Sequence, residues 1–152
     1  MFSAGQPEDL SQAEGTDFKL EPVAEVLKDG RIFLAELNLF LLSNAGLFRR
    51  GQEFQAKESF VQSVEGLEFF VAFIDQMASI SRLDLAVATY EGKSIREAFN
   101  DLNHVFTEII AAQEKSDWVL LADLVEYELA PQLQRWDGIV AMFGSAITAI
   151  RA

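Results

Sequence analysis

The chain has 152 residues, half of them hydrophobic and 24% charged, which is the composition of one folded domain rather than of a disordered chain. It has no cysteine and one histidine, which excludes disulfides, zinc–thiolate and iron–sulfur sites, thiol catalysis and any site built from several imidazoles. The net charge of −12 disfavours phosphate backbones and anionic bilayers, so we expect neither nucleic acid nor membrane as a partner.

Residues 1–19 are rich in Gly, Ser, Gln, Glu and Asp and show no apolar period, which predicts an acidic, mostly disordered tail. They also have neither the basic nor the apolar region of a signal peptide. The most apolar window, 32–48, carries Glu36, Asn38 and Asn44 and repeats in heptads. We therefore expect a core helix of a soluble, cytoplasmic protein rather than a membrane span.

The first helix is predicted from Pro22 to Arg50, because proline suits the first helical position and Gly51 suits the stop. Gly30 weakens its first turns. Leu37 joins two adjacent heptad rows that form a broad core-facing stripe: Val26, Phe33, Phe40, Leu47 and Leu27, Leu34, Leu41, Phe48.

The second helix is predicted over residues 53–79, and the short turn before it makes it an antiparallel neighbour of the first. Residues 82–93 break the helical period and predict an extended segment or loop without a strand partner. The apolar row of the second helix is Phe60, Val64, Leu67, Val71, Ile74 and Ala78, widened by Phe70 and Met77.

Ser94 and Glu97 form a capping-box pattern that opens a third helix, over residues 95–114. Asp117 is a suitable cap for a fourth helix over 118–150, which Pro131 should kink or break. The expected core row of this helix is Ala122, Val125, Leu129, Leu133, Trp136, Val140, Phe143, Ile147 and Ile150. Together, the elements predict an all-α, antiparallel four-helix bundle with a kinked C-terminal helix, as a single domain over residues 20–152.

Chemistry-bearing residues are sparse. Asp101 and His104 lie three residues apart on one helix face with Glu97 and Glu108, but a di-iron bundle needs two such pairs, so a solvated polar face explains them better. Phosphate-binding and hydrolase motifs are missing. Paired carboxylates could do acid–base work, but an exposed acidic stripe is the simpler account of Asp123, Glu126 and Glu128. We therefore expect no enzyme activity, no catalytic residue, no metal and no cofactor.

The end of the fourth helix is unusual, because no charged residue occurs from Gly138 to Ile150. Small residues also form a stripe there: Gly138, Ala141, Ser145 and Ala149. Either this segment lies deep in its own bundle, or it forms a homodimer interface or a groove for a partner helix. In the second case the candidate partner-binding residues are Trp118, Trp136, Ile139, Met142, Phe143 and Ile147.

The segment Asp117 to Trp136, DWVLLADLVEYELAPQLQRW, resembles one found in a family of small helical bacterial proteins of uncharacterised function. The region from Gly46 to Leu67 is similar to that family's first helix pair, so the likeness covers about residues 45–136. Such proteins are reminiscent of flagellar export chaperones, which are also small acidic helical bundles. The resemblance implies a role in holding an apolar helix and a link to motility or secretion.

These observations favour a non-enzymatic interaction module that binds a partner helix, or a second copy of itself, through apolar surface. Two alternatives stay open. One is a metal-binding bundle that uses Asp101 and His104, and the other is a small-molecule site between helices lined by phenylalanines.

Overall fold

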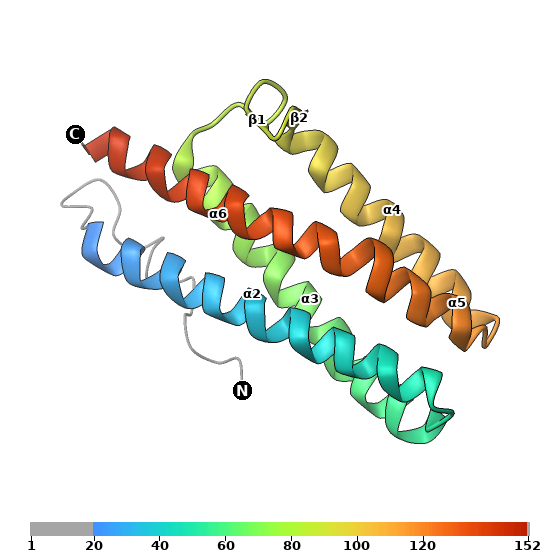
Figure 1. Cartoon of the computed structure of the whole chain (residues 1–152). Helices are drawn as coiled ribbons and strands as arrows, with labels where there is room; N and C mark the ends of the chain where they lie inside the picture. Colours follow the sequence, from blue (N-terminus) through green and yellow to red (C-terminus); the bar gives the residue numbers. More distant parts are fainter. Residues whose placement is uncertain (1–19, 152) are drawn as a thin grey trace.

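The structure is a computed structural model that describes residues 20–151, and the predicted acidic tail lies outside them. The described chain is almost wholly helical, which confirms the all-α prediction (Figure 1). Its helices are α2 (Leu20–Arg49), α3 (Glu53–Ser81), α4 (Ile95–Glu114), and a last helix built of α5 (Trp118–Asp123), η1 (Leu124–Leu129) and α6 (Ala130–Arg151). α2, α3 and α6 pack on one another, and α4 packs on α5 and η1.

A tight turn reverses the chain between α2 and α3. Gly51 adopts φ +75°, which favours glycine, and the Gln52 N–H donates to the Leu47 carbonyl at 3.0 Å. Asn44 then crosses from α2 and donates from Nδ2 to the Ala56 carbonyl at 2.8 Å, inside the core. These hydrogen bonds fix α3 against α2.

The core stripe of α2 is narrower than the two predicted rows. Leu34, Leu41 and Phe48 of the second row are buried with Leu37, but the first row is at most half-buried and Phe40 is 37% exposed. α3 differs in the same way. Val64 is exposed, and small residues face the core instead, among them Ala56, Ser63 and Gly66. The prediction from apolar spacing was wrong at these positions because small residues let the two helices approach closely.

Two glycines mark such close approaches. A Cβ on Gly30 of α2 would lie 2.2 Å from Cζ of Phe73 on α3, and one on Gly66 would lie 2.9 Å from Cδ1 of Leu37. Gly30 therefore makes room for the Phe73 ring, which offsets its low helix propensity.

The segment between α3 and α4 forms a hairpin, so the predicted lack of a strand partner was wrong. Strand β1 (Thr89–Tyr90) pairs antiparallel with β2 (Lys93–Ser94). Glu91 and Gly92 between them have φ +52° and +82°, as in the tight turns that close hairpins. The capping box of Ser94 is confirmed, since its hydroxyl accepts from the Glu97 N–H at 3.1 Å.

The last helix begins as predicted, with the Asp117 carboxylate accepting from the Leu120 N–H. Close to Pro131, where a kink or break is predicted, the helix contains the π-helical turn η1, which ends at Leu129. The Ala130 N–H donates to the Val125 carbonyl, one residue further back than in an α-helix. The predicted core row is buried from Ala122 to Ile147, while Ile150 is 46% exposed.

Of the helices in residues 20–151, α2 alone is long and apolar enough to cross a membrane by length and composition. Core helices of water-soluble proteins and signal sequences near an N-terminus both pass the same test, and 39% of the most apolar window of α2 is buried.

Candidate functional site

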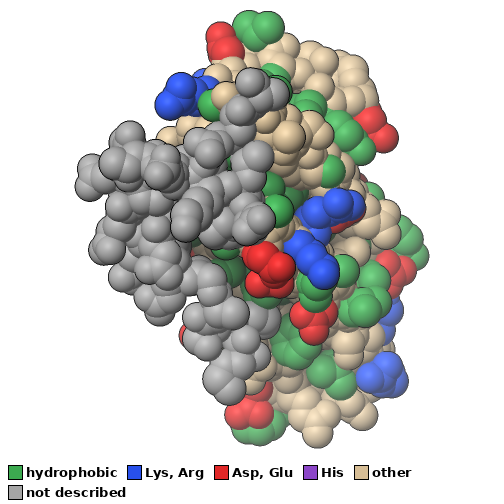
Figure 2. All heavy atoms as spheres, turned by 90° about the vertical axis from the view of Figure 1, so that its left-hand side faces the viewer, with side chains coloured by type: hydrophobic (Ala, Val, Ile, Leu, Met, Phe, Trp, Pro, Cys, Tyr) green, Lys and Arg blue, Asp and Glu red, His purple; other side chains and the backbone are tan. Residues whose placement is uncertain are grey.

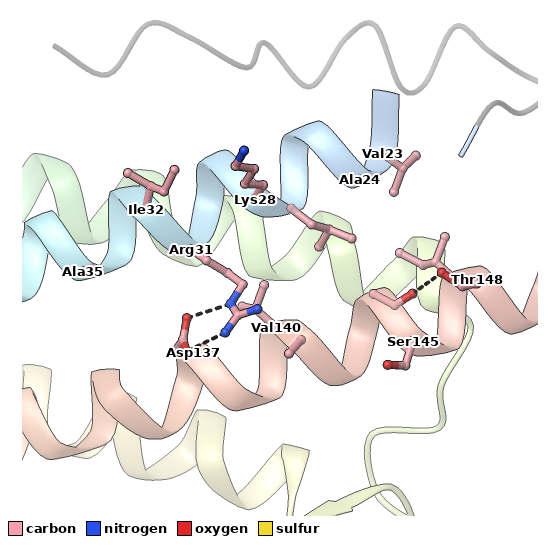
Figure 3. Close-up of a pocket in the computed structure, with 14 residues that line it drawn as sticks. Val23, Ala24, Lys28, Arg31, Ile32, Ala35, Asp137, Val140, Ser145 and Thr148 are labelled. Atoms are coloured by element: carbon pink, nitrogen blue, oxygen red, sulfur yellow. Dashed lines mark hydrogen bonds and ion pairs between the residues drawn. The ribbon is translucent and has the colours of Figure 1, made fainter. Parts of the chain in front are cut away.

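α2 and α6 lie side by side and are joined at the surface by a two-pronged ion pair (Figure 3). Nε and Nη2 of Arg31 donate to Oδ1 and Oδ2 of Asp137, both at 2.9 Å. The hydrogen bonds from Arg31 lower the pKa of Asp137, and the same contact raises the pKa of Arg31. Because both side chains remain more than 40% exposed, solvent screens this interaction strongly.

Beside this ion pair, α2 and α6 enclose a groove of about 900 Å³. Its floor is apolar and buried, formed by Val23, Val140 and Ile147. Its walls are made mostly of small or exposed side chains, so the groove is open to solvent. The remaining lining residues are Ala24, Leu27, Lys28, Arg31, Ile32, Ala35, Asp137, Ala141, Gly144, Ser145 and Thr148.

Gly144 sets how closely the two helices approach, because a Cβ there would lie 3.1 Å from Cδ1 of Leu27. The α6 side of the groove is lined by the small residues Ala141, Gly144 and Ser145. On α2, Ala35 is a small and exposed lining residue. Close approach of a second backbone is what such a surface allows.

The charges in the groove are few. Arg31 and Asp137 neutralise each other, and Lys28 makes no ion pair within the part of the chain that the structure describes. Figure 2 shows the face on the left of Figure 1, where apolar side chains lie among scattered acidic and basic ones. The groove lining thus carries one excess positive charge on a protein whose net charge is −12.

Most of the predicted partner-binding residues lie inside the domain. Trp136, Ile139, Phe143 and Ile147 are at most 2% exposed. The Trp136 ring packs between Phe70 of α3 and Phe99 of α4, with centroid distances of 6.4 and 4.7 Å. These four side chains belong to the core. Their burial corresponds to the alternative in which the uncharged segment lies deep in its own bundle. Only Ile147 also reaches the groove, as part of its floor.

The other two candidates are half-buried and lie elsewhere. Trp118 stacks on Phe48 at 5.0 Å, and Nζ of Lys57 lies 5.0 Å from the centre of its ring. Met142 packs against the core. Neither lines the groove between α2 and α6.

The structure gives most of the candidate metal ligands other partners. Asp101 pairs with Lys93, Glu97 caps α4, and His104 is 75% exposed with its Nε2 3.5 Å from Glu108. Within residues 20–151 no three His, Asp or Glu side chains are grouped to hold a metal ion.

Asp123 and Glu126, which belong to the segment Asp117 to Trp136 that carries the family resemblance, lie beside Arg49 of α2. Its Nη2 lies 2.8 Å from Oδ1 of Asp123, and its Nε lies 3.4 Å from Oε1 of Glu126. A hydrogen bond to Glu126 raises the pKa of Tyr127. These contacts tie the end of α2 to the π-helical turn, and they give Asp123 and Glu126 a structural role.

The sequence did not predict the α2 side of the groove. On the α6 side, Ala141 and Ser145 belong to the stripe of small residues that the sequence shows. A signal was present. Arg31 is the last charge before the apolar window 32–48, and Asp137 is the last charge before the uncharged segment. Only contact between α2 and α6 makes this pair informative.

Over residues 20–151, fold and site together define a mostly helical protein with an open groove between α2 and α6. The chain belongs to a family described as a domain of unknown function, DUF8042, whose model matches residues 25–139. No curated protein and no solved structure matches the chain. The match confirms an uncharacterised family, and it ends before the part of α6 that carries Gly144, Ser145 and Thr148.

Proposed function

We propose that the protein is a non-enzymatic interaction module that holds an apolar helix of a protein partner in the groove between α2 and α6. The observation that carries the proposal is the groove itself, with its buried apolar floor, its small-residue walls and its open side. Amphipathic helices bind such grooves through apolar side chains spaced three and four residues apart. Small-molecule sites, by contrast, enclose most of their ligand.

The proposal also covers the arrangement of the helices, the location in the cell and the biological role. In the proposed scaffold, α5, η1 and α6 act as one helix of an antiparallel four-helix bundle, which would hold the groove rigid. The tight turn after α2 and the packing of α4 on α5 and η1 support this arrangement. The acidic surface would keep the protein soluble in the cytoplasm and would disfavour acidic competitors. A chaperone-like role in bacterial motility or secretion is implied by resemblance alone.

The test places a photo-crosslinking amino acid at position 145 and collects cross-linked species from the source cell. We expect a protein whose cross-linked segment is an amphipathic helix. A second copy of this chain at the same position would instead identify a homodimer. The alternative of a small-molecule site predicts no cross-linked protein and a ligand that co-purifies.

A matched pair of variants controls the test. Ala35 in the groove and Ala72 on α3 are both exposed helical alanines, and we change each to glutamate. Ala35→Glu should abolish cross-linking from position 145, and Ala72→Glu should leave it intact, with helical circular dichroism unchanged in both. Equal cross-linking in the two variants would contradict binding in the groove.

A further inference from the structure

One end of the groove lies next to the point where residues 1–19 join the described chain. α2 begins at Leu20, and Val23 and Ala24 already line the groove. We propose that residues 1–19 fold back along the α2–α6 groove of their own molecule and compete there with the partner. The competition rests on the proposed function, because it regulates binding of that partner.

The length of the segment is sufficient. The groove is lined along α2 from Val23 to Ala35, which is about 18 Å at the helical rise of ~1.5 Å per residue. Nineteen residues reach up to about 60 Å when extended, at ~3.3 Å per residue. The segment can therefore reverse at the start of α2 and still cover the whole groove.

The composition of the segment fits an open groove with small-residue walls. Its large apolar side chains, Met1, Phe2, Leu10 and Phe18, are few and lie among glycine, serine, glutamine and acidic residues. The buried floor at Val140 and Ile147 can take one or two such side chains, while the small residues of α6 leave space for the connecting backbone.

Charge favours the groove over other parts of the surface. The segment carries four acids, Glu8, Asp9, Glu14 and Asp17, against Lys19, so a protein that is acidic overall repels it from most of its surface. The groove is different because Lys28 has no ion pair among residues 20–151 and Arg31 balances the only acid of the lining, Asp137.

Attachment to α2 further favours the protein's own segment over a second copy. Because residues 1–19 are joined directly to α2, their effective concentration at the groove is in the millimolar range, far above that of a dilute protein. Binding of the segment with a dissociation constant below this concentration would then occupy the groove for most of the time.

The absence of cysteine from the chain makes a clean test possible. We introduce one thiol into the groove of the full chain by Ser145→Cys and measure its alkylation by a maleimide. We expect this thiol to react about fivefold faster when Leu10→Asp and Phe18→Asp are also present. The factor is the protection that the bound segment gives when its effective concentration is about four times its dissociation constant. A thiol at exposed Thr107 of α4 should react equally in both backgrounds.

Equal rates at position 145 with and without the two tail substitutions would overturn the proposal. A second measurement pairs Leu10→Cys with Ser145→Cys under mild oxidation. An intramolecular disulfide that forms independently of protein concentration supports it, and a disulfide only between two copies overturns it. Because neither measurement uses a partner, their failure would leave the cross-linking test of the proposed function unaffected.

Discussion

Two glycines of α2 stand in the same helix for different reasons. Gly30 is buried beneath the Phe73 ring of α3, whereas a Cβ on Gly46 would meet only the guanidinium of Arg50, at 3.2 Å. Only the first position has a packing requirement for glycine. Helix propensity alone cannot distinguish the two, since it penalises glycine equally at both.

Alanine at these positions should therefore have opposite effects. Gly30→Ala should lower the free energy of unfolding by about 1–2 kcal/mol, because displacement of Phe73 outweighs the ~1 kcal/mol gained in helix propensity. Gly46→Ala should raise it by up to ~1 kcal/mol, because the Arg50 side chain can move. Urea denaturation of both variants measures the difference, and a similar change in both would disprove the role of Phe73.

The Arg31–Asp137 pair should make a small, pH-dependent contribution. Since the folded pKa of Asp137 is lowered, its stabilisation is present above the ordinary pKa of an aspartate and is lost as the pH falls through the folded value. Asp137→Asn should cost at most about 1 kcal/mol at pH 7, because the pair is exposed. The difference from wild type should vanish in acid below the folded pKa, and a difference that persists there would point to another cause.

At the scale of elements, helix ends followed local rules and the interior of the last helix did not. Ser94 and Asp117 cap α4 and α5 as expected from residue type. The π-helical turn has a signal that is clear only in retrospect. Core positions Val125, Leu129 and Leu133 are spaced by four and four, which suits a wider turn better than the usual alternation of three and four.

Loss of the Ser94 cap should destabilise α4. Ser94→Ala removes the acceptor of the Glu97 N–H and should lower the free energy of unfolding by about 1 kcal/mol. Thr107→Ala, in the exposed middle of the same helix, should change it by at most about 0.5 kcal/mol. Thermal unfolding of the two variants checks this, and an equal shift would show that the capping box is not stabilising.

At the scale of the molecule, the last helix serves both the core and the groove. Phe143 is fully buried, its neighbour Met142 is half-buried, and Ser145 is exposed at the groove wall. One helix thus presents large side chains inward and small ones outward within a single turn. The groove can therefore be altered without disturbing the core.

Truncation of these neighbours should separate the two roles. Phe143→Ala should cost about 3–5 kcal/mol, Met142→Ala about 1–2 kcal/mol because it is only partly buried, and Phe143→Asp should prevent folding. Ser145→Glu should leave stability within about 0.5 kcal/mol of wild type. Denaturation curves compare the variants, and a tolerated Phe143→Asp would place that side chain at the surface instead.

The heptad rows of α2, the capping box at Ser94 and the uncharged end of the last helix were sufficient to predict an all-helical fold, and the small-residue stripe pointed to one wall of the groove. These features are local, because backbone preference and apolar spacing act within a few turns of the same helix. The other wall depends on contact between Arg31 and Asp137, which lie 106 residues apart. Which apolar face of α2 is buried, why Phe40 is exposed and where the groove lies were decided by the tertiary structure, since they depend on how closely the helices approach one another at Gly30, Gly66 and Gly144.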